Sequence, residues 1–231
     1  MMAAIHECPS PNFDARPAAL VPDILLLHYT GMQSCEAAVE RLCDPAARVS
    51  SHYTVDEDGT VYRHVAEEHR AWHAGISYWA GARDINARSI GIEVVNPGHE
   101  FGYRPFPGRQ VEAVIRLARD ILSRHSIPAS RVIGHSDVAP ARKLDPGELF
   151  PWGALALDGV GLWPQTRRHR LEGSFREGLR RFGYGLSPDM EVPDSTVISA
   201  FQRHFRPLQI HGAEDEECRR ILAALLAEMR E

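Results

Sequence analysis

The sequence predicts an α/β fold in which a central mixed β-sheet is flanked by helices, with a small C-terminal three-helix domain after it. Two observations lead to this prediction. Apolar, strand-like runs are separated by segments with helical spacing, and one alternating segment with Asp58-Gly59 at its centre is typical of a β-hairpin. Strands separated by helices, together with a hairpin, form a mixed sheet covered by helices.

The strands of the first domain follow from short apolar runs. These runs are residues 23–29, 89–95 and 131–134, and the hairpin covers residues 51–65. Residues 7–22 contain several prolines and are predicted to be an irregular lead-in. Residues 66–88 show no sustained period, and a loop of this length inside a compact domain is more often functional than idle.

Two helices are predicted between these strands. Residues 33–43 place apolar side chains at helical spacing, with Ser34 in position to cap the start and Asp44-Pro45 at the end. Residues 110–125 have the clearest helical pattern of the domain, and Ile127-Pro128 marks its end.

The character of the chain changes after Trp163-Pro164. We expect a first domain over residues 1–163, a basic, polar linker over 164–173 and a three-helix module over 174–231. Asp194 or Ser195 could cap the second helix of this module, and Asp215 the third. So small a module is marginally stable alone, so we expect it to dock on the first domain. Removing residues 172–231 is nevertheless expected to spare the chemistry.

Composition and charge exclude several classes of protein. A formal net charge of −5, with 44% hydrophobic and 25% charged residues, argues against nucleic acid or an anionic membrane surface as the main partner. No apolar run approaches the length that spans a membrane, so no membrane insertion is expected. The first residues lack a secretory pattern, which favours a cytoplasmic location over a periplasmic one. The four cysteines form no disulfide framework and are expected to be reduced.

Three side chains are candidate metal ligands. His28 and His135 each end a strand-like apolar run, and Asp145 follows His135 by ten positions on a loop stiffened by proline. Two imidazoles and one carboxylate suit zinc better than magnesium or calcium, and they leave a fourth position for water. We therefore expect one Zn²⁺ per chain, held by these three residues.

Five ordered motifs make the resemblance to a family specific. The segments LLHYTG, SSHYTVDEDGTVYRHV, AWHAG, SIGIEVVN and GHSDVAPARKLDPG resemble the zinc-dependent N-acetylmuramoyl-L-alanine amidases of the amidase type 2 family. The resemblance implies hydrolysis of the amide between N-acetylmuramic acid, or its anhydro form, and L-alanine. The expected substrate is a soluble muropeptide met in cell-wall recycling, with intact peptidoglycan as the alternative.

The resemblance also suggests roles for residues near the metal. Glu93 matches the family's catalytic glutamate and is expected to act as general base, although a buried salt bridge is the ordinary alternative. Lys143, the only lysine of the chain, is expected to stabilise the oxyanion of the tetrahedral intermediate. Asp137 would orient His135 or cap its loop.

Further side chains are candidates for binding the substrate. Arg142 could meet carboxylates of the stem peptide. The side chains expected to line the groove are His52, Trp72, His73 and Asn86. Trp72 and His73 could equally brace the loop.

Two rival functions remain open from the sequence. Members of the family that lose a zinc ligand recognise peptidoglycan without cutting it, but all three ligand positions are filled here. A deacetylase could use the same site and would release acetate instead of peptide. The C-terminal segment AFQRHFRP resembles peptidoglycan-binding modules, whereas the following IHGAED lacks their usual second glycine. The module could therefore bind wall polymer or serve only as a docked, stabilising bundle. Oligomeric state is left open.

Overall fold

The computed structural model describes residues 5–164, 169–186 and 192–229. The strands are β1 (Ile5–Glu7), β2 (Phe13–Ala15), β3 (Ile24–Tyr29), β4 (Tyr53–Val55), β5 (Val61–Arg63), β6 (His69–Ala71), β7 (Ser89–Val94) and β8 (Val132–Gly134). The helices are α1 (Cys35–Cys43), α2 (Gly108–Arg124), α3 (His135–Val138), α4 (Trp152–Leu157), α5 (Phe175–Phe182), α6 (Asp194–Phe205) and α7 (Glu216–Glu228), with short 3-10 turns at η1 (Asn86–Arg88) and η2 (Ala129–Arg131).

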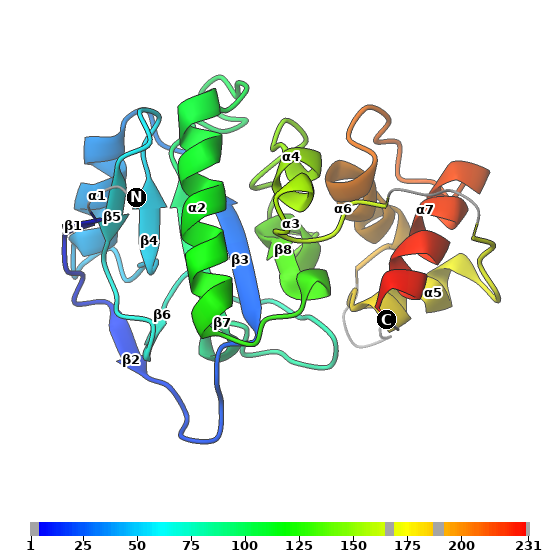
Figure 1. Cartoon of the computed structure of the whole chain (residues 1–231), viewed down its shortest axis with the longest axis horizontal. Helices are drawn as coiled ribbons and strands as arrows, with labels where there is room; N and C mark the ends of the chain where they lie inside the picture. The colour runs from blue at the N-terminus through cyan, green and yellow to red at the C-terminus, as the bar shows by residue number, and fades with distance from the viewer. Residues whose placement is uncertain (1–4, 165–168, 187–191, 230–231) are drawn as a thin grey trace.

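A six-stranded mixed sheet forms the centre of the fold, in the order β1-β5-β4-β7-β3-β8. The pairs β4–β7, β7–β3 and β3–β8 are parallel, and β4–β5 is the predicted antiparallel hairpin. A separate two-stranded sheet joins β2 to β6. Figure 1 shows α2 crossing one face of the large sheet, while α5, α6 and α7 gather beyond the β8 edge. The predicted α/β class is confirmed.

The alternation of side chains along each strand separates two cores. Leu25, Leu27, Ile90 and Ile92 point to the face covered by α2 and belong to one buried apolar cluster. The intervening residues of β3 and β7 point to the other face, because successive side chains of a strand point in opposite directions. His28 and Glu93 are among them, which places the candidate catalytic side chains on the face that α2 leaves open.

The C-terminal helices share the second core with the sheet. Ile24 and Leu26 of β3 and Ile133 of β8 form one buried cluster with side chains of α5, α6 and α7. Trp79, from the loop before β7, packs against Phe182 and Tyr184 with ring centroids 5.9 and 5.0 Å away. The C-terminal helices therefore dock on the first domain as expected, and their side chains share one continuous core with the sheet.

Trp79 lies so close to the chain after α5 that only glycine fits there. A Cβ added to Gly183 would lie 2.5 Å from the indole, and Gly183 has a φ of +143°. The carbonyl of Gly183 also accepts a hydrogen bond from the amide of Ala80 at 2.8 Å. The loop of the first domain and the C-terminal helices thus fit each other closely at this point.

Most predicted elements are present, with a few corrections. Ser34 and Asp215 cap α1 and α7 as expected. The N-cap of α6 is Pro193 with no side-chain cap, so the alternatives Asp194 and Ser195 were wrong. Strands β2 and β6 lie in segments predicted to be irregular, and β1 begins just before the first of these segments. Within the predicted linker, residues 165–168 lie outside the described residues, and Leu171 is buried in the shared core instead of exposed.

No helix within residues 5–164, 169–186 and 192–229 is long and apolar enough to cross a membrane.

Candidate metal centre and active site

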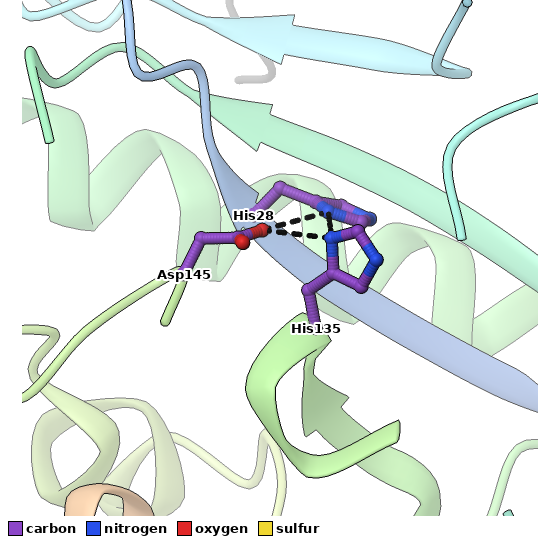
Figure 2. A group of neighbouring side chains, drawn as sticks. All are labelled: His28, His135 and Asp145. Atoms are coloured by element: carbon purple, nitrogen blue, oxygen red, sulfur yellow. Dashed lines mark hydrogen bonds and ion pairs between the residues drawn. The ribbon is translucent and has the colours of Figure 1, made fainter. Parts of the chain in front are cut away.

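Three buried side chains converge where two adjacent parallel strands end. His28 lies near the carboxyl end of β3, and His135 directly follows β8, which pairs with β3 in parallel. Parallel neighbours end at the same edge of a sheet, so the two imidazoles come together there. Asp145 reaches the same point from the loop after α3, as Figure 2 shows. The predicted three residues are thus brought together.

Their donor atoms form a nearly equilateral triangle. The distances His28 Nδ1–His135 Nδ1, His28 Nδ1–Asp145 Oδ2 and His135 Nδ1–Asp145 Oδ2 are all 3.0 Å. Ligands of a tetrahedral zinc ion, at bond lengths of about 2.0–2.1 Å, lie about 3.3 Å apart. The three side chains are 1%, 3% and 5% exposed. Among the described residues they are the one group of His, Cys, Asp and Glu side chains with the spacing of a metal site.

Hydrogen bonds on the far side of each imidazole favour the tautomer that a metal needs. His28 Nε2 lies 3.0 Å from His73 Nδ1, and His73 Nε2 lies 3.3 Å from the hydroxyl of Ser89, which donates to the carbonyl of Ile85. When His28 Nδ1 is unprotonated and free for a metal, each group of this series donates a hydrogen bond to the next, from His28 through His73 to Ser89. His135 Nε2 donates to the carbonyl of Ala74 at 3.0 Å, which leaves its Nδ1 free as well.

The electrostatics keep His28 and Asp145 in their metal-binding forms. Burial, and then His135, lowers the pKa of His28 to about 4, so its imidazole is neutral near pH 7. Burial alone would raise the pKa of Asp145, but His135 and His28 lower that pKa well below its ordinary value. Burial, followed by His28 and His52, also lowers the pKa of His73 well below its ordinary value. Two neutral imidazoles and an ionised carboxylate are the forms that bind a metal.

Glu93 lies beside the three candidate ligands. It pairs in register with His28, and its Oε2 is buried without a hydrogen-bond partner among the described residues. Burial raises the pKa of Glu93 well above its ordinary value; Asp145 adds to the effect, and Lys143 opposes it. A buried carboxyl group with a raised pKa beside candidate metal ligands is a candidate for proton transfer.

A cavity of about 620 Å³ opens over this group of side chains. The three candidate ligands, Glu93 and Lys143 line it, together with three predicted substrate-binding residues, Trp72, His73 and Arg142. Its volume lies within the range of pockets that bind small molecules.

Two predicted lining residues do not face the cavity. The imidazole of His52 is fully buried and is bonded to the amide of Gly91 and the carbonyl of His69. The side chain of Asn86 accepts hydrogen bonds from the amides of His73 and Ala74. These two side chains, which were expected to line the groove, instead bond to backbone polar groups, which need buried partners.

Arg142 lines the cavity, but its guanidinium is already engaged. It donates to the carbonyls of Ala74 at 3.1 Å and of Ile76 at 2.6 Å. Since Ala74 also accepts from His135, Arg142 braces the loop that orients a candidate ligand.

The sequence analysis missed several residues of this region. The cavity is also lined by Tyr29, Thr30, Met32, Arg41, His99 and Glu100. Arg41 lies in the last turn of α1, where an exposed arginine gives no sequence signal because the polar face of any helix carries such residues. His99 follows a glycine-rich turn, which predicts a loop and says nothing of where the loop folds.

Comparisons with known proteins agree with this geometry. The family model for N-acetylmuramoyl-L-alanine amidase (Amidase_2) matches residues 18–148. The N-acetylmuramoyl-L-alanine amidase AmiD of Escherichia coli (strain K12) is 39% identical over 228 residues, 88% of this chain and 82% of that protein. The 1,6-anhydro-N-acetylmuramyl-L-alanine amidase AmpD of the same strain is 34% identical over 173 residues, 68% of this chain and 92% of that protein.

A solved structure extends the likeness to the whole fold. The complex of E. coli AmiD with the substrate anhydro-N-acetylmuramic acid-L-Ala-D-γ-Glu-L-Lys superimposes with a TM-score of 0.80 at 37% identity, over 92% of each chain. With the family model covering more than half of its residues, this chain belongs to the N-acetylmuramoyl-L-alanine amidase family.

Proposed function

We propose that this protein hydrolyses the amide between anhydro-N-acetylmuramic acid and L-alanine in muropeptides, with one zinc ion held by His28, His135 and Asp145. The observation that supports this most directly is the 3.0 Å triangle of two imidazole nitrogens and one carboxylate oxygen at the floor of a cavity. Zinc bound there would supply Lewis-acid chemistry, activating water as a nucleophile and polarising the carbonyl of the amide.

Glu93 is proposed to move the proton. Its buried Oε2 would accept a proton from the attacking water and pass it to the nitrogen of the leaving L-alanine. The raised pKa of the Glu93 carboxyl suits a proton-transfer role, because this carboxyl takes up a proton more readily than an ordinary glutamate does.

Lys143 is proposed to stabilise negative charge on the carbonyl oxygen of the reacting amide. Lys143 is half-buried, lines the cavity and lies two positions before Asp145 in the sequence. A fixed cation at this place favours the tetrahedral intermediate over the planar amide.

The proposal that the substrate carries an anhydro sugar is based on the names of the relatives. The AmpD proteins are named for 1,6-anhydro-N-acetylmuramyl-L-alanine, and E. coli AmiD was solved with an anhydro-muramoyl tripeptide. Trp72 is proposed to contact the sugar or the peptide, since an indole face stacks on either. Intact peptidoglycan remains the alternative substrate. Recycling of soluble muropeptides would place the protein in the cytoplasm, whereas attack on the wall would place it in the periplasm.

The proposed division into a catalytic domain over residues 1–163 and a helical module over 174–231 is supported by the length of one relative. AmpD matches 68% of this chain over 92% of its own length, so the proposed chemistry does not depend on a counterpart of every segment of this chain. Whether the module binds wall polymer is a separate question.

The decisive experiment combines metal analysis with product analysis. The purified protein should hold one zinc per chain and convert anhydro-N-acetylmuramoyl tripeptide to free tripeptide and anhydro sugar, read by mass spectrometry. Asp145→Ala should lose zinc and activity together. His99→Ala, which changes another histidine of the cavity, is the matched control and should keep the zinc. Release of acetate with the sugar–peptide bond intact would instead identify a deacetylase.

The non-catalytic alternative gives a different result in the same assay. A recognition protein would bind the muropeptide and leave it uncut, with or without zinc. The presence of all three candidate ligands argues for the enzyme.

A further inference from the structure

A second buried cluster lies directly behind the candidate metal centre. The carboxylate of Asp137 accepts three hydrogen bonds: from the amide of Gly134 at 2.8 Å, from the hydroxyl of Tyr184 at 2.6 Å and from Nδ1 of His204 at 2.7 Å. Asp137, Tyr184 and His204 are 1%, 0% and 2% exposed. Two of the three donors therefore come from the C-terminal part of the chain.

This carboxylate controls the backbone on both sides of His135. Asp137 belongs to α3, a helix of only one turn whose first residue is His135. The hydrogen bond from the amide of Gly134 to Asp137 ties this turn to the end of β8. The junction is tight, because a Cβ added to Gly134 would lie 2.7 Å from Pro146 and 3.4 Å from Asp137 Oδ2. A shift of Asp137 would therefore move the backbone that carries His135.

The imidazole of His204 is held firmly in place. It stacks between the rings of Trp152 and Phe205, with centroids 3.9 and 3.8 Å away and interplanar angles of 21° and 6°. Stacking on both faces fixes the plane of the ring, so Nδ1 keeps its aim at Asp137. The other nitrogen, Nε2, is buried and has no partner among the described residues. His204 thus makes one polar contact, and that contact is to Asp137.

The residue before His204 reaches a second part of the site. Arg203 Nε lies 3.7 Å from Glu148, and Glu148 lies 3.2 Å from His99, which lines the cavity. Two successive residues of α6 thus contact carboxylates that lie beside the cavity.

We propose that His204 and Tyr184 are positioning residues of the metal centre: through Asp137 they hold His135 in the orientation that a metal requires. The inference rests on the proposed function, since it presumes a metal at His28, His135 and Asp145. It gives the C-terminal helices a role in the amidase site itself, whether or not they bind wall polymer. Neither His204 nor Tyr184 lines the cavity, so they act on the chemistry only through Asp137.

The test measures zinc affinity, by competition with a chelating dye, in the full-length protein. His204→Leu removes the donor and should weaken zinc binding by about tenfold, the usual scale for residues that orient metal ligands. His204→Asn keeps an amide donor at the place of Nδ1 and should restore most of the affinity. Tyr184→Phe removes one oxygen atom and keeps the ring packing, so it should weaken binding several-fold even if His204→Leu folds poorly.

A matched control separates positioning from general stability. Val197→Ala lies on the same helix, in the shared core, at 0% exposure. It should lower Tm without changing zinc affinity. The visible absorption of the cobalt-substituted protein reports ligand geometry directly, and it should change in His204→Leu and stay unchanged in Val197→Ala.

A double variant tests the route through Asp137. If His204 acts through this carboxylate, Asp137→Ala with His204→Leu should bind zinc no more weakly than Asp137→Ala alone. Wild-type affinity and an unchanged cobalt spectrum in both His204→Leu and Tyr184→Phe would overturn the inference, as would an equal loss of affinity in Val197→Ala. If the wild-type protein itself bound no zinc at the three ligands, the proposed function would fail instead.

Discussion

At the scale of single residues, Glu93 carries the sharpest prediction. Glu93→Gln keeps the size of the side chain but cannot take up a proton, so kcat should fall by about 10²–10⁴-fold while zinc content stays unchanged. Steady-state kinetics and metal analysis on the same sample would check this. Glu100→Gln, which alters another carboxylate of the cavity, should retain most of the activity. An active Glu93→Gln variant would disprove the role of general base.

Gly91 shows how closely the support of His28 is packed. A Cβ at this position would lie 2.6 Å from Nδ1 of His73, the atom that faces His28. Gly91→Ala should lower the free energy of unfolding by about 1–3 kcal/mol, as overpacking of a core does, and should weaken zinc binding because His73 must move. Urea denaturation and dye competition would measure the two effects.

Gly108→Ala provides the control for that substitution. A Cβ on Gly108, the first residue of α2, meets nothing within 4 Å. This change should leave zinc binding untouched and stabilise the protein by at most about 1 kcal/mol. Equal losses in the two variants would mean that the contact with His73 is not the cause.

The sequence predicted the meeting of His28, His135 and Asp145 because each follows a strong local signal, a strand end or a stiff loop. It expected His52 and Asn86 to line the cavity, whereas both bond to backbone groups, because the same residue types serve as buried hydrogen-bond partners and as exposed substrate contacts. Tyr184 and His204 carried no signal at all. A polar residue in an amphipathic helix is read as exposed, and only the tertiary packing shows that it is buried.

At the scale of elements, long periodic segments were predicted well. The seventeen-residue helix α2 shows a clear repeat, and the six-residue strands β3 and β7 are clear apolar runs. Strands β1, β2 and β6 have three residues each, which is too short for an alternating pattern to stand out. They form because partner strands supply hydrogen bonds, and these partners are distant in sequence.

His52 links two of these elements and should make their stability depend on pH. Its Nδ1 accepts from Gly91 of β7, and its Nε2 donates to the carbonyl of His69 in β6. Burial, and then Arg16, lowers the pKa of His52 from 6.5 to about 3. As the pH falls through this interval, the unfolded chain takes up a proton that the folded protein refuses, so this residue destabilises the fold at low pH.

His52→Asn retains an acceptor for Gly91 and removes the titrating group. In urea denaturation without added metal, the wild-type free energy of unfolding should fall more steeply than that of His52→Asn as the pH is lowered from 6.5 towards 3. One proton corresponds to a difference in slope of about 1.4 kcal/mol per pH unit. Parallel curves for the two proteins would show that His52 does not stay neutral in the fold.

At the scale of the whole molecule, the shared core bears on how the protein unfolds. The sequence divided the chain into two domains and expected the chemistry to survive removal of residues 172–231. Apolar residues of β3, β8, α5, α6 and α7 form one buried cluster, so the docked helices share a core with the sheet. An amphipathic helix reveals which of its faces is apolar, but its sequence does not say what covers that face.

We therefore expect a single cooperative transition for the full-length protein. Differential scanning calorimetry should give a calorimetric enthalpy equal to the van't Hoff enthalpy, as two-state unfolding requires. A chain ending at residue 163 would expose Trp79 and Ile24 and should aggregate or lose zinc. Two separate transitions, or a stable and active truncated protein, would instead support independent domains.

The contact between Trp79 and Gly183 limits how the C-terminal helices could be exchanged among members of the family. A chimera that joined another member's helices after residue 164 would need a glycine at the place of Gly183. Without one, the donor's own segment equivalent to residues 77–82 would have to come with the helices. Recombination at the apparent linker would thus give a mismatched protein, and the boundary suited to engineering runs through two separate stretches of the chain.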